Sequence, residues 1–348
     1  VLSRLVIEQQ PIPDGLPDNF DFSGTNDGSP ITPFQLGDDG EAELTGPLDA
    51  TYVISETIPD GFEIDSIVCT NQTTGSPANV TANAATGQVT VVMSGSQFDV
   101  RCVYTNDQLP ATLTVVKNTN GGDDSFDFSW FSTNNPSTDF QLATSGGTAE
   151  QTFQIETGLG DTDFVVAESL TQAQVDAGWV PESAQCVFAD DPNNPVIGSV
   201  LPNGDGAVVA GLTLNAGDDV TCTFVNNAPA QLTVSKIAQG GDDTFRFVAL
   251  GLPAPNDIFF ITTMMGSGSN GPITVPIPDS STGVDIDIVE DINNTPGWNL
   301  VDITCSGTDE TVNSNLVDII LQPGDVVDCT FTNVADGQIS VVKNTLGG

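Results

Sequence analysis

The sequence contains no histidine and very few basic residues. Lysine and arginine together number 6, against 47 aspartates and glutamates, which gives a formal net charge of −41. A protein that binds nucleic acid needs cations to neutralise phosphates, so this balance argues against nucleic acid as a partner. Without histidine, and without a C-x-x-C spacing, a zinc site is not expected either.

Long apolar runs and helix-forming runs are also missing. No stretch of the sequence is long enough to predict a transmembrane segment. There is neither an initiating Met nor a signal peptide, so we expect a processed or partial chain. Thr, Val, Asn, Asp, Gly and Pro are abundant instead. This composition is typical of short strands joined by turns and predicts an all-β protein.

One strand motif returns at intervals of roughly a hundred residues. ATLTVVKNTNGGDDSFDF (111–128) reappears as QLTVSKIAQGGDDTFRF (231–247), and its first part ends the chain as QISVVKNTLGG (338–348). Such a period predicts an array of similar domains. We assign domain 1 to residues 1–110, where the motif is degenerate and lacks lysine, domain 2 to 111–230 and domain 3 to 231–336. Residues 337–348 would be the first strand of a fourth repeat or a strand donated to a neighbouring subunit.

Each repeat has room for about seven or eight short strands separated by Pro-, Gly- and Asp-rich turns. That number favours a Greek-key, immunoglobulin-like β-sandwich. An insertion in domain 2, residues 170–178, predicts a short helix that ends at Gly178. The linkers between repeats are only a few residues long, which predicts a stiff rod.

The 6 cysteines fall two in each repeat: Cys69 and Cys102, Cys186 and Cys222, Cys305 and Cys329. Six cysteines can pair in many ways, but the repeat favours one bridge in each domain. Each bridge would close a loop of roughly 25–37 residues and contribute about 3–4 kcal/mol in the chain-entropy description. Disulfides indicate an oxidising setting, outside the cell or on its surface.

Strand alternation brings three polar side chains to the inner face of each sandwich, because residues two apart share a face. The inward rows are Leu113, Val115 and Lys117; Leu232, Val234 and Lys236; Phe164, Val166 and Glu168; Ile286, Ile288 and Glu290; Cys222, Phe224 and Asn226; Cys329, Phe331 and Asn333. A buried lysine or glutamate is expensive when it is alone. We therefore expect one lysine, one glutamate and one asparagine to meet inside each complete repeat.

These three groups can react with one another. Desolvation lowers the pKa of a buried lysine and so supplies a neutral amine. It also raises the pKa of the glutamate, which can then hydrogen-bond the asparagine carbonyl as an acid. Attack of the amine on that carbonyl expels ammonia and leaves a Lys–Asn isopeptide bond. The alternative is an unreacted buried Lys–Glu pair, with the asparagine capping the strand end.

The segments LTVVKNTNGGDDSFDF, VVAES with a following Gly-Trp, and DDVTCTFVNN resemble the CnaB-type, SpaA-like domains of bacterial pilins and surface adhesins. The resemblance covers all three repeats and is strongest in domains 2 and 3. It implies a prealbumin-like fold. It also implies an isopeptide between Lys117 and Asn226 promoted by Glu168, and a second between Lys236 and Asn333 promoted by Glu290.

Domain 1 departs from this pattern. Gln9 stands where the lysine is expected, although Glu56 and Asn106 are present. Lys343 lies on a first strand that has no domain behind it. One hypothesis is that residues 338–345 of one molecule add to domain 1 of the next, so that Lys343 bonds to Asn106 and a head-to-tail filament grows. The alternative is that Lys343 belongs to a fourth repeat of a longer array.

Two weaker signals lie in the GGDD loops and near the cysteines. The loop carboxylates Asp123, Asp124, Asp242 and Asp243 are candidate Ca²⁺ ligands, but the pattern of an EF-hand is incomplete and a solvated acidic turn is the alternative. No other cofactor is expected. Trp179 and Trp298 each follow a glycine and lie near a cysteine, so we expect them to pack on the disulfides.

Together these features predict an extracellular structural protein, a stalk or a pilus-like homopolymer, with no enzymatic activity beyond autocatalytic bond formation. One alternative is a cell-surface adhesin or S-layer-type segment that binds a glycan or a host-surface ligand. A glycoside-active enzyme is a more remote alternative. It would need two placed carboxylates, and with 47 acidic residues any pair can be proposed. The sequence has no P-loop, dinucleotide-binding or nucleophile-elbow motif.

Overall fold

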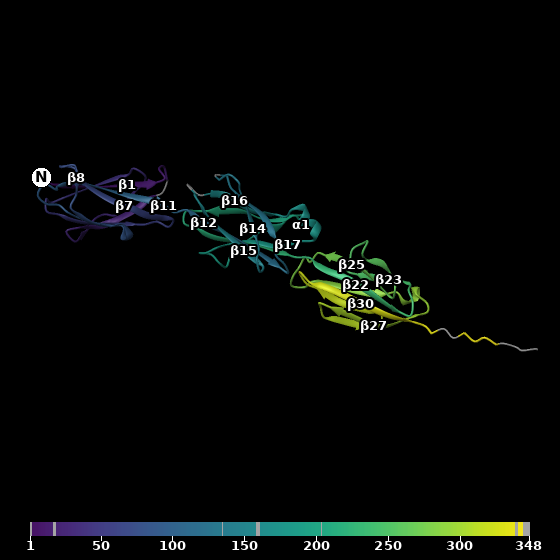
Figure 1. The fold of residues 1–348 in the computed structure, drawn as a ribbon. Coiled ribbons are helices and arrows are strands. Elements are labelled where there is room, and N and C mark those ends of the chain that lie inside the picture. The colour runs from purple at the N-terminus through teal and green to yellow at the C-terminus, as the bar shows by residue number, and fades with distance from the viewer. Residues whose placement is uncertain are drawn as a thin grey trace, which may run out of the picture.

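The computed structural model describes residues 2–16, 19–133, 135–157, 161–202, 204–337 and 340–343. Over these residues the chain forms three β-sandwiches in a row, each made of two facing sheets (Figure 1). The expectation of an all-β protein with three tandem sandwiches is therefore confirmed. Within the described ranges, no helix has the length and apolar character needed to cross a membrane.

Domain 1 contains sheets in the orders β5-β1-β11-β7-β8 and β3-β2-β6-β10-β9, with β4 paired to β2. The strands of the first sheet are β1 (Ser3–Ile12), β5 (Glu41–Gly46), β7 (Phe62–Asn71), β8 (Ser76–Pro77) and β11 (Asp99–Gln108). Those of the second are β2 (Phe20–Asn26), β3 (Ser29–Pro30), β4 (Phe34–Leu36), β6 (Thr51–Thr57), β9 (Val80–Asn83) and β10 (Gln88–Val92). A 3₁₀ turn, η1 (Ala84–Thr86), precedes β10.

Domain 2 repeats this plan with sheets β15-β12-β21-β17-β18 and β14-β13-β16-β20-β19. The first sheet contains β12 (Ala111–Asn120), β15 (Thr148–Ile155), β17 (Val180–Phe188), β18 (Val196–Ile197) and β21 (Asp219–Asn227). The second contains β13 (Ser125–Phe131), β14 (Thr138–Ala143), β16 (Asp161–Ser169), β19 (Ser199–Val200) and β20 (Gly206–Leu214). The predicted helix is present as α1 (Gln172–Ala177), with a capping box between Thr171 and Gln174 and with Gly178 at its end.

Domain 3 has sheets β25-β22-β30-β27 and β24-β23-β26-β29-β28. The first sheet contains β22 (Ala230–Gln239), β25 (Ser267–Val275), β27 (Trp298–Ser306) and β30 (Val326–Ala335). The second contains β23 (Thr244–Leu250), β24 (Ile258–Thr262), β26 (Val284–Glu290), β28 (Glu310–Asn313) and β29 (Leu316–Leu321). A 3₁₀ turn, η2 (Ile292–Asn294), follows β26.

In every domain the first and last strands are parallel neighbours: β1 with β11, β12 with β21, and β22 with β30. Because they run in the same direction, the chain enters a sandwich at one end and leaves it at the other. Successive domains therefore follow one another end to end, and the molecule is elongated (Figure 1).

Strand alternation places the core as the sequence predicts. Along β12, Leu113, Val115 and Lys117 are buried, while Thr112 and Thr114 on the other face are half-buried. Each sandwich has its own apolar core between its two sheets. Burial of a large apolar side chain contributes about 1.5–3 kcal/mol, so these rows supply much of the driving force for folding.

The strand predicted at the C-terminus is not formed where the chain is described. Ser340–Lys343 are exposed and lie outside any strand, with Val341 88% and Val342 79% exposed. Residues 338–339 and 344–348 lie outside the described residues. A strand needs a neighbour to satisfy its backbone groups, and no strand of the described chain pairs with Ser340–Lys343.

Candidate functional site

Two of the three lysines are fully buried. Lys117 on β12 and Lys236 on β22 are both 0% exposed. Lys117 continues the inward row that begins with Leu113 and Val115. A charged ammonium inside a protein costs several kcal/mol unless it is paired, so each lysine needs polar partners in the core.

An asparagine from the neighbouring strand lies next to each lysine. Lys117 is opposite Phe224 in the parallel register of β12 and β21, and Asn226 follows two residues later on the same face. The same register places Asn333 beside Lys236 in domain 3. The two asparagines are 0% and 1% exposed. The first and last strands of domains 2 and 3 therefore bring an amine and a carboxamide together.

The glutamate comes from the facing sheet. Glu168 lies on β16, opposite Phe128 of β13, and Glu290 is the last residue of β26. Both are fully buried. Facing sheets pack about 10 Å apart, so a glutamate and a lysine that both point inward can meet between them.

In domain 2 one carboxylate oxygen bridges the amine and the amide. Glu168 Oε1 forms an ion pair with Lys117 Nζ at 2.9 Å, and it accepts a 2.9 Å hydrogen bond from Asn226 Nδ2. Among the described residues, no hydrogen-bond partner is present for the buried Asn226 Oδ1 or Glu168 Oε2. The glutamate contacts both the amine and the amide nitrogen, while Lys117 Nζ, although ion-paired, makes no well-aligned hydrogen bond among the described residues and the asparagine carbonyl is left unsatisfied.

In domain 3 the corresponding groups form a closed set of hydrogen bonds. Lys236 Nζ donates to Asn333 Oδ1, to Glu290 Oε2 at 3.1 Å and to the Phe331 carbonyl oxygen at 3.2 Å. Asn333 Nδ2 donates to the second carboxylate oxygen, Glu290 Oε1, at 2.6 Å. The glutamate again contacts both the amine and the amide nitrogen.

Burial controls the protonation of these groups. Desolvation lowers the pKa of Lys117 and of Lys236 to about 8, although the neighbouring glutamate opposes the shift. Desolvation also raises the pKa of Glu168, against the opposing effects of Lys117 and Asn226. Both shifts favour a neutral amine beside a neutral acid, and the neutral amine is the nucleophilic form of lysine.

An aromatic ring lies next to each ammonium, and strand alternation does not predict it. Lys117 Nζ lies 4.6 Å from the centroid of Phe126, and Lys236 Nζ lies 4.4 Å from that of Phe245. Each phenylalanine is the first aromatic residue after a GGDD loop, so the repeated SFDF and TFRF segments held the signal. The ring shields the amine from water and attracts its positive charge.

Domain 1 keeps this arrangement without an amine. Gln9 occupies the position on β1, opposite Tyr104, that lysine occupies in the other domains. Its Nε2 donates to Asn106 Oδ1 at 2.8 Å, and Asn106 Nδ2 donates to Glu56 Oε1 at 2.6 Å. Burial raises the pKa of Glu56 to about 7. The acid and the carboxamide are in place, but no nucleophile faces them.

One expectation differs from this geometry. The predicted hydrogen bond joins the glutamate to the asparagine carbonyl, whereas in all three domains the carboxylate accepts from the asparagine nitrogen. The pairing of Lys343 with Asn106 of a neighbouring molecule stays a prediction. Gln9 of the same chain holds Asn106, so a donated strand would have to displace β1, and half of the proposed donor segment, residues 338–345, lies outside the described residues.

The cysteines are joined within each domain, as Cys69–Cys102, Cys186–Cys222 and Cys305–Cys329. Each bridge links directly opposite residues of antiparallel neighbours, β7 with β11, β17 with β21 and β27 with β30. The last strand of every domain is therefore tied to one neighbour by a disulfide. Its other neighbour carries the lysine, or Gln9 in domain 1.

The GGDD carboxylates hold backbone groups. Asp123 accepts hydrogen bonds from the N–H groups of Gly146 and Gly147 at 2.9 and 2.8 Å, and Asp242 forms the equivalent pair in domain 3. These bonds lower the pKa of both aspartates. The second aspartate of each loop, Asp124 or Asp243, accepts from the N–H of the next residue. Calcium binding by these loops stays a prediction.

The tryptophans pack beside the same loops and not on the disulfides, so that expectation was wrong. Trp179 contacts Phe126 edge-on, with ring centroids 5.3 Å apart. Trp298 Nε1 donates to Asp243 Oδ2 at 2.9 Å. Cys186 lies seven residues beyond Trp179, which is about 20 Å along an extended strand. Each tryptophan therefore covers the end of the core next to a GGDD loop.

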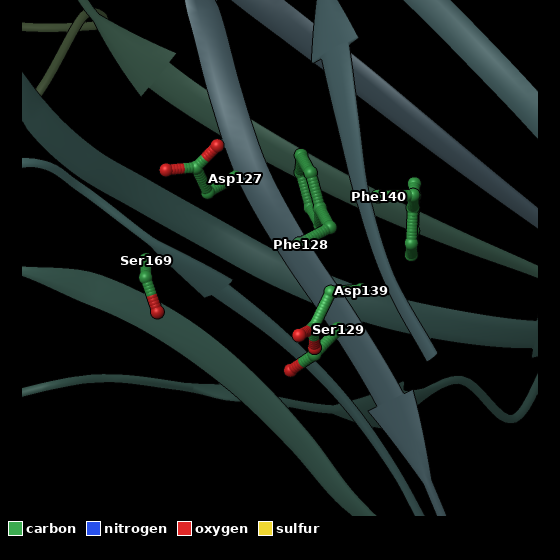
Figure 2. Close-up of a pocket in the computed structure, with 6 residues that line it drawn as sticks. All are labelled: Asp127, Phe128, Ser129, Asp139, Phe140 and Ser169. Carbon is green, nitrogen blue, oxygen red and sulfur yellow. The ribbon is translucent and has the colours of Figure 1, made fainter. Parts of the chain in front are cut away.

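A shallow depression lies on the outer face of domain 2, lined by Asp127, Phe128, Ser129, Asp139, Phe140 and Ser169 and about 310 Å³ in volume (Figure 2). It contains two carboxylates, which a glycoside-active site would need. Asp127 accepts from Gln141 Nε2 at 2.9 Å and Asp139 accepts from Ser137 Oγ at 3.1 Å. Both carboxylates thus bind residues of β14 or of the loop before it. Neither belongs to the buried triads, as we call the sets of lysine (or Gln9), glutamate and asparagine between the two sheets of each domain.

Comparison with known proteins places these features in a family. The model of the prealbumin-like fold domain matches the sequence three times, over residues 6–108, 113–228 and 232–335. Each match covers one sandwich together with its triad positions and its disulfide. None of the curated proteins compared with the chain matches it in sequence.

Several solved structures are distantly similar. The Bacillus anthracis TIE protein is 12% identical with a TM-score of 0.37, and the match covers 96% of this chain but only 51% of that one. BcpA, the major pilin subunit of Bacillus cereus, is 11% identical with a TM-score of 0.32 and coverages of 97% and 100%. The major pilin from Streptococcus pyogenes is 14% identical with a TM-score of 0.26 and coverages of 65% and 97%.

These structural similarities are too distant to assign an activity. The matches of the family model do not depend on them, and they cover most of the chain in three consecutive segments. The chain therefore belongs to the family of prealbumin-like fold domains.

Proposed function

We propose that this protein is an extracellular structural protein, a stiff surface stalk or pilus-type fibre whose domains 2 and 3 are each closed by an isopeptide bond. The observation that carries the proposal is the buried contact of amine, carboxylate and carboxamide, repeated at the same positions of two domains. An enzyme needs its site once, whereas a spacer benefits from the same cross-link in every module. The disulfides are compatible with an oxidising location outside the cell.

The proposed reaction joins Lys117 to Asn226 and Lys236 to Asn333. The ammonium passes a proton to the glutamate, and the neutral amine attacks Cγ of the asparagine. The bond from Cγ to the amide nitrogen then breaks, and that nitrogen takes up a proton and leaves as ammonia. Of the three ammonium protons, one stays on the new amide, one leaves with the ammonia and one remains on the glutamate. One C–N bond forms and one breaks, so no oxidant or cofactor is needed.

The glutamate is positioned for both proton transfers. Glu168 Oε1 touches the attacking nitrogen of Lys117 and the departing nitrogen of Asn226. Glu290 contacts the same two nitrogens in domain 3 through separate oxygens. The product also removes the charged pair from a dry interior, where charges are unfavourable. The environment that makes the unreacted triad costly therefore favours the bond.

The positions of the bonds suit a load-bearing role. Tension enters domain 2 at the start of β12 and leaves at the end of β21, and these strands are parallel neighbours. A bond from Lys117 to Asn226 would carry the force directly between the two strands. Residues 118–225 could then not extend, and only the short segment before Lys117 could be pulled out.

Intact mass under reducing and denaturing conditions tests this proposal. We expect the mass to be lower than that of the sequence by two molecules of ammonia. Glu168→Gln and Glu290→Gln should each restore one of them, because glutamine cannot relay the proton. Glu56→Gln is the matched control in domain 1 and should leave the mass deficit unchanged.

The same sample reports on assembly and on the alternative functions. Covalent ladders on a denaturing gel would support a homopolymer, whereas a single band with the full mass deficit would support a stalk. A protein that folds and keeps all its ammonia would contradict covalent closure. Selective binding to a glycan or host surface by a monomer would favour an adhesin instead.

A further inference from the structure

A strand bulge directs one glutamate of domain 2 towards domain 3. The pairing of β17 with β21 shifts between Pro181 and Ser183, so Glu182 has no partner in the ladder. A bulge bends the strand and re-aims a side chain. Here the re-aimed carboxylate reaches Ser280, which lies in the loop between β25 and β26 of the next domain.

The carboxylate of Glu182 forms bonds on both sides of the joint. Its Oε1 accepts from the backbone N–H of Ser280 at 3.0 Å and from the Ser280 hydroxyl at 2.8 Å. Its Oε2 accepts from Asn120 Nδ2 of its own domain at 3.2 Å. Hydrogen bonds to a carboxylate are roughly twice as strong as those between neutral groups. We call Glu182, Asn120, Asn227 and Ser280 the clasp.

Asn227 provides a second polar link in the clasp. It is fully buried at the end of β21, its Oδ1 accepts from Asn120 at 2.8 Å, and its Nδ2 donates to the carbonyl oxygen of Ile277 at 3.0 Å. The Ile277 side chain is itself fully buried in the core of domain 3. The link therefore ends on a backbone group that cannot move without disturbing that core.

The loop that receives these bonds is held in shape by its own residues. Asp279 Oδ1 accepts from the N–H and the hydroxyl of Ser281 at 2.8 and 2.6 Å. The carbonyl oxygen of Asp279 accepts from the N–H of Gly283 at 2.9 Å. Ser280 is thus presented by a preorganised loop, which reduces the entropy lost when the two domains dock.

Two glycines of domain 2 lie close against domain 3 elsewhere. A Cβ on Gly178, at the end of α1, would lie 2.9 Å from Thr274 Cγ2, and one on Gly121 would lie 2.2 Å from the carbonyl carbon of Pro323. Both glycines also have positive φ, +92° and +82°, which other residues rarely adopt. Domain 2 therefore meets domain 3 through β17, α1 and the loop after β12, and contacts from three elements resist bending in more than one direction.

The joint between domains 1 and 2 also has backbone contacts. The N–H of Leu109 donates to the carbonyl oxygen of Gly61 at 2.8 Å, and the carbonyl oxygen of Leu109 accepts from the N–H of Gly217 at 3.2 Å. A Cβ on Gly61 would lie 2.5 Å from the carbonyl oxygen of Ala216 in domain 2. A cleft of about 530 Å³ opens beside it, lined by Ile12, Pro13, Asp107, Gln108 and Glu156. The bulge in the β7–β11 pairing leaves Asp65 as the unpaired residue, and Asp65 is exposed.

The two linkers have the same length. Two residues separate β11 from β12 and two separate β21 from β22, as Leu109–Pro110 and Ala228–Pro229. Each linker has a proline in its second position, so the two should be similarly stiff. Between domains 2 and 3 the clasp adds side-chain hydrogen bonds to this linker.

We propose that domains 2 and 3 form one rigid unit held by the clasp. This inference does not depend on isopeptide formation. For a surface protein, such an arrangement gives a stiff two-domain rod.

Residual dipolar couplings of backbone amides in the full chain test the proposal, because each domain reports the alignment that it experiences. We expect equal alignment magnitudes in domains 2 and 3. Unequal magnitudes in these two domains would overturn it.

Variants separate the clasp from general effects on folding. Glu182→Ala should make domains 2 and 3 unequal, and Ser280→Ala, which removes one bond to the carboxylate, should have a smaller effect in the same direction. Glu156→Ala, an exposed glutamate in the cleft at the other joint, is the matched control and should leave domains 2 and 3 equal. Amide spectra of each domain show whether it stays folded. Equal alignment of domains 2 and 3 in a folded Glu182→Ala protein would contradict the role of the clasp.

Discussion

Replacing Gln9 with lysine should give domain 1 the isopeptide bond that it lacks. Gln9 faces Tyr104 in the register in which Lys117 faces Phe224. Its side-chain nitrogen already lies 2.8 Å from Asn106 Oδ1. The reaction also needs a glutamate with a raised pKa, and burial raises the pKa of Glu56 to about 7. Only the amine is missing, so Gln9→Lys should release one further molecule of ammonia.

The expected gain in stability follows from the length of chain that the bond encloses. Residues 9 and 106 are separated by 97 positions. In the chain-entropy description, a cross-link around a loop of about 100 residues contributes about 4.7 kcal/mol. In a domain of roughly 100 residues each kcal/mol raises Tm by about 4–8 °C, so domain 1 should melt about 20 °C higher or more. An unreacted lysine at this position would instead bury a charge at a cost of several kcal/mol and lower Tm.

Formation of the bond should therefore lower the intact mass and raise the Tm measured by calorimetry. The closed variant should lose a third molecule of ammonia and be more stable, and the double variant Gln9→Lys/Glu56→Gln should lose only the two of domains 2 and 3 and melt below the wild type. Asn106→Ala in the Gln9→Lys background removes the acceptor and should behave like that double variant. A folded Gln9→Lys protein without this third loss would refute the claim that amine, glutamate and asparagine suffice for the reaction.

Three other predictions concern pH, force and the GGDD loops. Because burial raises the pKa of Glu56 to about 7 from its ordinary value of 4.5, folded domain 1 binds a proton more tightly than the unfolded chain. Its stability should therefore fall by about 3 kcal/mol as pH rises from 4.5 to above 7. Denaturant titrations should show this slope, and Glu56→Gln should abolish it. Under single-molecule force domain 1 should extend except for the residues enclosed by its Cys69–Cys102 disulfide, whereas domains 2 and 3 should release only the residues before Lys117 and Lys236. Extension of domains 2 and 3 up to their disulfide-enclosed loops would contradict closure. Finally, Asp123→Ala should lower Tm equally with and without calcium, because Asp123 holds the N–H groups of Gly146 and Gly147. A calcium-dependent rise in Tm that this variant abolishes would favour a metal site instead.

The sequence by itself determined the architecture, because the relevant information is local and repeated. A strand motif with a period of roughly a hundred residues predicts tandem domains, and turn residues between short apolar rows predict strands. The alternation along single strands was enough to place Lys117, Glu168 and Asn226 on inward faces. Burial of charge then required that they meet, and they do.

Tertiary structure alone decided how these groups face one another and how the domains are joined. Side-chain alternation gives the face of a residue but not the orientation of its amide, so the contact of Glu168 with the nitrogen of Asn226 could not be predicted. It also says nothing about rings that approach from the facing sheet, such as Phe126 over Lys117. The clasp depends on a bulge at Glu182 and on a loop about a hundred residues later. Neither follows from local sequence, because both are set by how distant strands and domains pack.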